Sequence, residues 1–385
     1  MPGIFGIVSS APRPNLSADL AEMARRLKHH SWYKEDRHVS AANDLGLGRV
    51  SLGFVNTAAQ PATNEDGSLL AVMDGEVYDY AEQRQALAAD GHVFQGDGHA
   101  ELLLHGYESA GEKFFRRLHG TFAAAIWDTR HRRLVLANDR FGMKGLYYAV
   151  LPGRLLFASE IKALLIDPEL SRRLNPRGLA QFFTFSQLLG EDTLLEAVQL
   201  VPAAGWLTYT ADGGRLSHDR YWKPDTRARV SGRSEQSVLD EIDEAFARAV
   251  ARCTRGAEQL GLSLSGGLDA RTILGVIAPD RSVKTVCLGM EGSLDHNCAE
   301  EMARLANRQH HRYVLNTHFL ARYEEYLAHD VHLTDGHYLS SCIVMPTLPI
   351  YRELGIQEVV FNVPSGTREE ILPVLDGYAR YLNGA

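Results

Sequence analysis

The stretch with the clearest potential for chemistry runs from Leu262 to Leu274 and reads LSLSGGLDARTIL. The apolar run Leu260–Leu264 predicts a buried strand, the two glycines predict a turn, and Arg271–Ile277 predicts a helix. Glycines let a backbone approach an anion closely, and the free N–H groups at a helix start attract it. Because Asp269 cannot itself hold a phosphate, it indicates a hard cation such as magnesium between carboxylate and phosphate oxygens.

Two interpretations of this stretch are open. One is a nucleotide site, in which the glycine loop holds a phosphate or pyrophosphate. The other is a tight strand-to-helix turn with an aspartate cap, which a pair of glycines favours when it stands alone. Motifs elsewhere in the chain decide between them.

Size and composition indicate a globular protein of two domains. The chain has 385 residues, 45% of them hydrophobic and 23% charged. A formal net charge of −8 without a basic stripe argues against a nucleic-acid partner, so small-molecule ligands are expected. The first residues lack the basic flank of a signal peptide, and no run of about 20 apolar residues predicts a membrane span. We therefore expect a cytoplasmic protein with no membrane partner.

Cysteines and histidines give no sign of a metal site. The four cysteines fall in no paired spacing, so we expect reduced thiols rather than disulfides or zinc ligands. The histidines, His310 and His311 among them, show no ligand spacing and are interpreted as surface and packing residues.

The order of strand and helix patterns in the first part of the chain predicts stacked antiparallel sheets covered by helices. The predicted strands are Gly3–Ser9, Leu69–Met73, Thr121–Trp127, Leu134–Ala137, Leu146–Val150 and Leu155–Ala158, with Val283–Leu288 in the second part. The predicted helices are Ser17–Lys28, Tyr80–Ala89, Ala100–Ala110, Val238–Cys253 and Asp295–Asn307.

Several motifs that follow one another along the chain resemble the glutaminase domain of the asparagine synthetase family. They include the opening MPGIFGIV, the DGEVY of Asp74–Tyr78, the segment Asn138–Tyr148 and the segment Phe157–Leu164. The loop Ser265–Asp269 resembles the ATP-pyrophosphatase loop of the same family. This resemblance favours the nucleotide site over the plain turn.

The resemblance implies an α/β and α+β protein of two domains. Residues 1–225, including a linker from about residue 171, are expected to form an αββα N-terminal-nucleophile sandwich of the class II glutaminase type. Residues 226–385 are expected to form a doubly wound parallel α/β ATP-pyrophosphatase domain, which binds ATP at the carboxyl ends of its strands. We expect this domain to be truncated at its C-terminus, because family members continue with helices that close the synthetase site.

The glutaminase half departs from the family at its catalytic positions. The family nucleophile is a cysteine at position 2, and Pro2 has no thiol to form an acyl-enzyme. Asp74 replaces an asparagine of the oxyanion hole, where a carboxylate would repel the developing charge, and His99 replaces an aspartate that holds the glutamine amine. Arg49, which grips the glutamine carboxylate in the family, is kept, and we favour a structural ion pair for it. New chemistry at the Pro2 amine is a less favoured alternative. The glutamine-site remnants are Pro2, Arg49, Asp74, Gly75, Glu76 and His99.

In the second half, the resemblance implies that Leu264 and Leu288 contact adenosine, although both also fit as core leucines. Ala270 replaces a serine of the loop and so removes a hydrogen bond to pyrophosphate, worth about 1 kcal/mol. Arg271 either supplies positive charge there or points into solvent, and the sequence leaves both open. The predicted ATP-binding residues are Leu264, Ser265, Gly266, Gly267, Leu288, Ser365 and Gly366.

The predicted metal ligands for magnesium are Asp269, Glu369 and Glu370. The pair Glu369-Glu370 stands where the family has an Asp-Glu pair, and the longer glutamate arm suits the octahedral geometry of magnesium poorly.

Two functions fit these observations. The preferred one is an ATP-dependent, AMP-forming ligase that adenylates a small-molecule or peptide carboxylate for attack by ammonia or an amine, as in the β-lactam synthetases and lasso-peptide cyclases of this family. Its catalytic residues are Ser265, Asp269 and Arg271. The alternative is a catalytically incomplete relative that binds a nucleotide or a partner chain. Completion of the site by a second chain, in a homodimer or with another protein, is left open.

Overall fold

The computed structural model describes residues 3–53, 55–225, 232–257, 259–335 and 358–360. The chain divides into two compact units, Met1–Gly232 with Ala328–Ser340, and Arg233–Leu327 with Ser341–Ala385. Among the described residues, no helix has the length and apolar character needed to cross a membrane.

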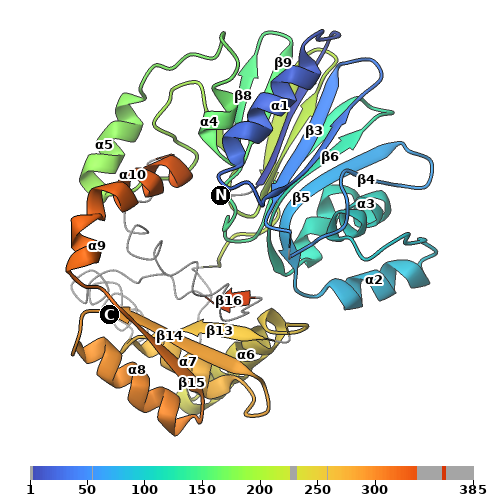
Figure 1. Ribbon diagram of the computed structural model, residues 1–385. Coiled ribbons are helices and arrows are strands. Elements are labelled where there is room, and N and C mark those ends of the chain that lie inside the picture. The colour runs from blue at the N-terminus through green and yellow to red at the C-terminus, as the bar shows by residue number, and fades with distance from the viewer. Residues whose placement is uncertain (1–2, 54, 226–231, 258, 336–357, 361–385) are drawn as a thin grey trace. The chain divides into compact units, whose positions relative to one another are not determined.

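The first sheet of the first unit has six strands, each antiparallel to its neighbours, in the order β10-β8-β9-β1-β3-β2 (Figure 1). Along β1 the side chains alternate, as a strand buried on both faces requires. Ile4 and Val8 enter the core between the two sheets, whereas Phe5 and Ile7 pack with helix α1 (Leu16–Leu27). The strands are β1 (Gly3–Ser9), β2 (Lys34–Val39), β3 (Leu45–Ser51), β8 (Tyr147–Leu151), β9 (Arg154–Ala158) and β10 (Gln199–Leu200).

The second sheet has six antiparallel strands in the order β12-β11-β7-β6-β5-β4. In β5, Leu70 and Val72 face the core between the sheets, whereas Ala71 and Met73 pack with helix α3 (His99–Ala110). The layers are therefore helix, sheet, sheet and helix, which confirms the predicted αββα sandwich. The strands are β4 (Ala62–Thr63), β5 (Leu69–Val77), β6 (Gly120–Asp128), β7 (Arg133–Asn138), β11 (Gly205–Thr210) and β12 (Arg215–Arg220).

Two segments of the first unit differ from the sequence prediction. Strand β5 does not end at Met73 but continues to Val77, because Asp74, Gly75 and Glu76 also pair with β6. The segment expected to link the two halves supplies β10, β11 and β12, which complete the two sheets. The remaining helices of this unit are α2 (Tyr80–Ala89), the 3₁₀ helix η1 (Gly111–Arg117), α4 (Ile161–Leu164) and α5 (Pro176–Phe185).

The second unit contains a parallel sheet of four strands in the order β15-β14-β13-β16. Strands β14 and β16 lie on opposite sides of β13, so the order in which the chain adds strands to the sheet reverses at β13. Ligands of such sheets bind beside this reversal, at the carboxyl ends of the strands. Its core joins Leu260, Leu262 and Leu264 to Ala299 and Ala303. The strands are β13 (Leu260–Ser263), β14 (Val283–Gly289), β15 (Gln309–Val314) and β16 (Glu358–Val360).

The helices of the second part follow the sequence with small shifts. Helix α7 (Leu268–Val276) begins three residues before the predicted Arg271, because Gly267 serves as its N-cap. Helix α6 (Glu235–Cys253) begins at a Ser234 cap whose side chain accepts from the Ser237 N–H. The others are α8 (Leu294–Leu305), α9 (Thr317–Ala321) and α10 (Tyr323–Thr334).

Candidate functional site

The first unit has a small pocket, of about 120 Å³, where strands β3 and β5 lie near the segment that precedes β8. Most of the predicted glutamine-site remnants line it. Its lining residues are Arg49, Ser51, Leu52, Val55, Asn56, Met73, Asp74, Gly75, Glu76, Thr121 and Lys144.

Asp74 is nearly buried in this pocket and pairs with a cation. The Lys144 Nζ lies 3.0 Å from Asp74 Oδ2, and Asp74 is 9% exposed. The neighbouring carboxylate, Glu76, has a raised pKa because burial disfavours its charge, although Lys144 opposes the rise. An oxyanion brought to this pocket would therefore meet a carboxylate that already holds the nearest lysine.

Gly75 has a conformation that only glycine adopts easily, with a φ of +96°. A Cβ at this position would lie 2.0 Å from the carbonyl oxygen of Thr121. The glycine thus lets β5 pair closely with β6 at the floor of the pocket.

Arg49 is held by the protein itself. Its Nε and Nη2 donate to Asp36 Oδ2 at 3.0 and 2.7 Å, and the side chain is 3% exposed. Nη1 donates to the carbonyl of Asn56 at 2.7 Å, and Nη2 donates to that of Ala58 at 2.9 Å. These bonds occupy four of the five N–H donors of a guanidinium, so Arg49 acts as a brace for the chain after β3.

His99, at the start of α3, is a neutral ring in this environment. Its Nδ1 accepts the backbone N–H of Val77 at 2.8 Å, and its ring stacks on Tyr80 with centroids 4.6 Å apart. Burial lowers the pKa of His99 to about 4, with a smaller opposing effect of Asp97. A substrate amine would find no negative charge on this side chain at neutral pH. Pro2 lies outside the described residues.

In the second unit, the loop between β13 and α7 has its amides bonded to side chains. The Gly266 N–H donates to Asp295 Oδ1 at 2.9 Å, and the Gly267 N–H donates to Ser265 Oγ at 3.2 Å. These amides stand before the positive end of α7, which is the arrangement that binds anions. A phosphate that bound here would replace carboxylate or hydroxyl oxygens that already occupy the donors.

The predicted residues of this loop separate into exposed and buried groups. Asp269 and Arg271, in the first turn of α7, are exposed, and Ser265 is half-buried. Leu264 is 1% exposed and belongs to the core, whereas Leu288 is half-buried near the end of β14. The predictions for Ser365, Gly366, Glu369 and Glu370 lie outside the described residues.

Sequence reasoning did not single out Asp295 or His296, which open α8 beside the loop. His296 is 1% exposed, and neither ring nitrogen has a hydrogen-bond partner within the described part of the chain. Its Nε2 would lie 3.3 Å from a Cβ on Gly289, at the carboxyl end of β14. The available signal was positional, since α8 follows β14 and its first turn therefore lies at the same sheet edge as the glycine loop.

Comparison with known proteins places the fold in a family. The profile of the glutamine amidotransferase domain matches residues 1–222, and that of asparagine synthase matches residues 241–359. The chain therefore belongs to the family of glutamine amidotransferase domains, here followed by an asparagine synthase domain as in the asparagine synthetase family that the motifs predict.

Individual relatives carry related names. Asparagine synthetase (glutamine-hydrolyzing) 2 of Bacillus subtilis (strain 168) is 27% identical over 80% of this chain and 43% of its own length. A putative asparagine synthetase of Mycobacterium tuberculosis (strain H37Rv) is 34% identical over 63% of this chain and 38% of its own. Amidase chry2 of Gibberella zeae is 31% identical over 64% of this chain and 36% of its own length. The chain thus spans less than half the length of these relatives.

Proposed function

We propose that this chain is an ATP-dependent, AMP-forming ligase that joins a carboxylate to ammonia or an amine without hydrolysing glutamine. The observation that carries the proposal is the glycine loop Ser265–Gly267 between β13 and α7, at the winding reversal of a parallel sheet. Membership of the family and the names of its relatives support the reaction class.

The loop fits the departing pyrophosphate. Gly266 and Gly267 present N–H groups that now donate to the side chains of Asp295 and Ser265. A phosphate is a stronger acceptor, and we expect it to displace these side-chain oxygens. Asp269 and Asp295 supply carboxylate oxygens at this edge, which are the ligands that magnesium prefers. Magnesium, when bound, would offset the charge of the phosphates.

The proposed reaction has two balanced steps. A carboxylate oxygen of the substrate attacks the α-phosphorus of ATP, the bond to the β-phosphate oxygen breaks, and pyrophosphate leaves. A nitrogen nucleophile then attacks the acyl carbon of the adenylate, loses a proton, and displaces AMP. Loop amides and the start of α7 stabilise the charge of the leaving pyrophosphate, and Arg271 in the exposed first turn adds a cation.

We infer the loss of glutamine hydrolysis from residues of the first unit. Pro2 provides no thiol nucleophile, Asp74 carries a negative charge where an oxyanion would form, and the His99 ring is neutral. We therefore expect free ammonia, or an amine of the substrate itself, to supply the nitrogen.

ATP–pyrophosphate exchange tests the proposal. The purified chain with magnesium is offered a panel of amino acids and peptides, with Asp269→Ala as the variant and Asp280→Ala, an exposed aspartate beyond α7, as its matched control. Exchange that depends on one carboxylate, falls at least about 100-fold in Asp269→Ala and persists in Asp280→Ala supports the ligase. ATP binding without exchange for any carboxylate would instead support the incomplete nucleotide-binding relative.

A further inference from the structure

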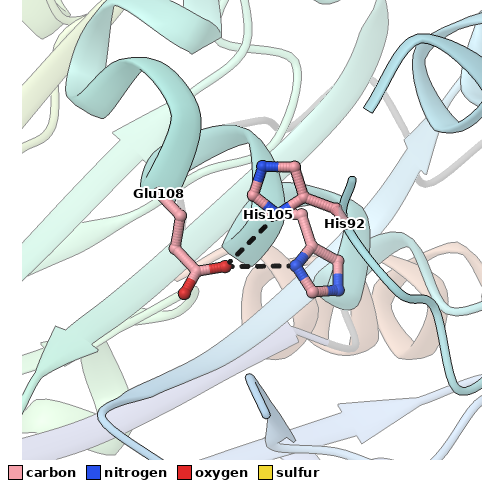
Figure 2. Close-up of side chains that lie close together, drawn as sticks. All are labelled: His92, His105 and Glu108. Atoms are coloured by element: carbon pink, nitrogen blue, oxygen red, sulfur yellow. Dashed lines mark hydrogen bonds and ion pairs between the residues drawn. The ribbon is translucent and has the colours of Figure 1, made fainter. Parts of the chain in front are cut away.

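A cluster of metal-binding side chains lies in the first unit, away from the pocket around Asp74. His92 follows helix α2, whereas His105 and Glu108 lie one turn apart on α3, and all three side chains point toward one another (Figure 2). One ligand atom of each lies within 4.8 Å of the other two. We propose that these three residues bind a divalent transition metal of the zinc class.

The distances suit a tetrahedral ion. His105 Nδ1 lies 3.1 Å from Glu108 Oε2, and His92 Nδ1 lies 3.7 Å from the same oxygen (Figure 2). Around a tetrahedral zinc with bonds of about 2.0–2.1 Å, neighbouring ligand atoms are separated by about 3.4 Å. These two distances lie on either side of this value, and the two imidazole ligand atoms lie within 4.8 Å of each other, so side-chain rotations that draw the imidazoles together would bring all three atoms to the ion.

A hydrogen bond orients Glu108, and a carboxylate faces the far side of the His105 ring. Asn64 Nδ2 donates to Glu108 Oε1 at 2.6 Å, which leaves Oε2 directed at the imidazoles. His105 is 1% exposed, and its Nε2 lies 3.9 Å from Glu101 Oε1 without a hydrogen bond within the part of the chain that is described. A metal on Nδ1 fixes the proton on Nε2, facing this carboxylate, as metal-bound histidines usually require.

The local charge also favours a dication. Glu101 and Glu108 both face the His105 ring, and Glu65 Oε1 accepts the backbone N–H of Val93, the residue after His92. Three carboxylates in this small region supply negative charge that a divalent ion offsets.

The bound ion would join the segment after α2 to helix α3. Glu101 accepts the backbone N–H groups of Gln95 and Gly96, so the same helix already holds this segment at a second point. His92 also lines an open groove of about 490 Å³ along α2, and Glu108 is exposed, so two of the three ligands are accessible to water. The site is therefore of the three-ligand, open kind.

To test the proposal, the full chain is first treated with a chelator to remove bound metal. It is then titrated with Zn²⁺ and followed by calorimetry, and separately titrated with Co²⁺ and followed by visible absorption. We expect one equivalent to bind, and Co²⁺ to give the strong visible bands of a tetrahedral complex. His92→Ala and Glu108→Gln should each weaken Zn²⁺ binding more than about 100-fold, and Glu101→Gln should weaken it about 10- to 100-fold.

Two controls separate this site from adventitious binding by other histidines. His218→Ala removes an exposed histidine of β12. His30→Ala removes a histidine from a second pair of neighbouring histidines, His30 and His329, whose ring centroids lie 6.2 Å apart. Both should bind Zn²⁺ like the unaltered chain. The proposal is overturned if the His92→Ala and Glu108→Gln chains, folded by circular dichroism, keep the one-equivalent site, or if His30→Ala loses it. No step uses ATP, so the outcome is independent of the proposed ligase.

Discussion

At the residue scale, Asp74 and Arg49 in the pocket of the first unit, and His99 at the start of α3, already interact with other groups of the protein. Lys144 is paired with Asp74, the Arg49 donors are used by Asp36 and two carbonyls, and burial keeps His99 neutral. These are long-range contacts, between residues up to 70 positions apart. The sequence therefore shows which residue types are substituted but not which partners neutralise them.

Restoring a thiol alone should not restore glutamine hydrolysis. The single variant Pro2→Cys should release no glutamate from glutamine. Asp74 still repels the oxyanion, and the neutral His99 ring gives the substrate amine no negative partner. The triple variant Pro2→Cys, Asp74→Asn, His99→Asp should release it measurably. A coupled glutamate assay distinguishes the two. Hydrolysis by the single variant would show that the Asp74 and His99 substitutions are tolerated.

We expect His296 to lower the stability of the fold while it contributes to ATP binding. A buried ring whose two nitrogens have no hydrogen-bond partner among the described residues costs about 1–3 kcal/mol, so His296→Leu should raise the free energy of unfolding while it weakens ATP binding about tenfold. The control is His311→Leu, which removes a ring of β15 whose Nε2 has no hydrogen-bond partner in the described part of the chain, and it should leave ATP affinity unchanged. Urea denaturation and calorimetry measure the two effects. Greater stability with unaltered affinity would mean that His296 has no ligand role.

The neutral state of His99 should appear as a pH dependence of stability. Its pKa is about 4 in the folded chain and about 6.5 when unfolded, so below pH 6.5 the unfolded state takes up more protons. The stability contributed by neutral His99 is complete above pH 6.5 and is lost as the pH falls toward 4. Between pH 7 and 4 the unaltered chain should lose about 3 kcal/mol more stability than the His99→Asn variant does.

Denaturant titrations at each pH measure this difference. His218→Asn, at an exposed position on β12, should keep the slope of the unaltered chain. Equal slopes for His99→Asn and the unaltered chain would show that the ring titrates normally.

At the scale of elements, alternation and turn residues predicted most strands and helices, and the errors have local causes. The Asp74-Gly75-Glu76 run resembles a turn, yet it continues β5 because Gly75 takes a positive φ while paired with β6. Helix α7 begins early because Gly267 caps it. The group His92, His105 and Glu108 was not foreseen from the sequence, because His105 and Glu108 share a helix turn but His92 comes from a separate loop.

Gly75 gives the sharpest test of how β5 and β6 are held together. Gly75→Ala should destabilise the chain by about 3 kcal/mol or more, because the new Cβ would lie 2.0 Å from the Thr121 carbonyl oxygen. Gly67→Ala is the matched variant, since Gly67 also has a positive φ, of +71°, but no heavy atom within 4 Å of a Cβ. It should cost only about 1–2 kcal/mol for the left-handed conformation. Similar losses in urea denaturation would show that the strands separate to accommodate the methyl group.

At the scale of the whole molecule, the chain joins an antiparallel sandwich to a unit built on a parallel sheet. The sandwich was predictable in outline because both faces of its strands are buried and alternate between two cores. The contact of Asp295 with the glycine loop was not predictable from the sequence. It joins residues 29 positions apart, which come together only because β13 and β14 are neighbours in the parallel sheet. The first unit keeps the architecture of a glutaminase, whereas the second presents anion-binding amides.

Hydrogen–deuterium exchange of the intact chain should separate the two units by ligand. With ATP and magnesium, amides of Ser265–Gly267 and the first turns of α7 and α8 should exchange more slowly, because the proposed phosphate site orders them. Glutamine should leave the exchange of Asp74–Val77 unchanged, since Arg49 and Lys144 already have protein partners. Protection of Asp74–Val77 by glutamine would show that the first unit still binds it, and the assignment of free ammonia or a substrate amine as the nitrogen source would then fail.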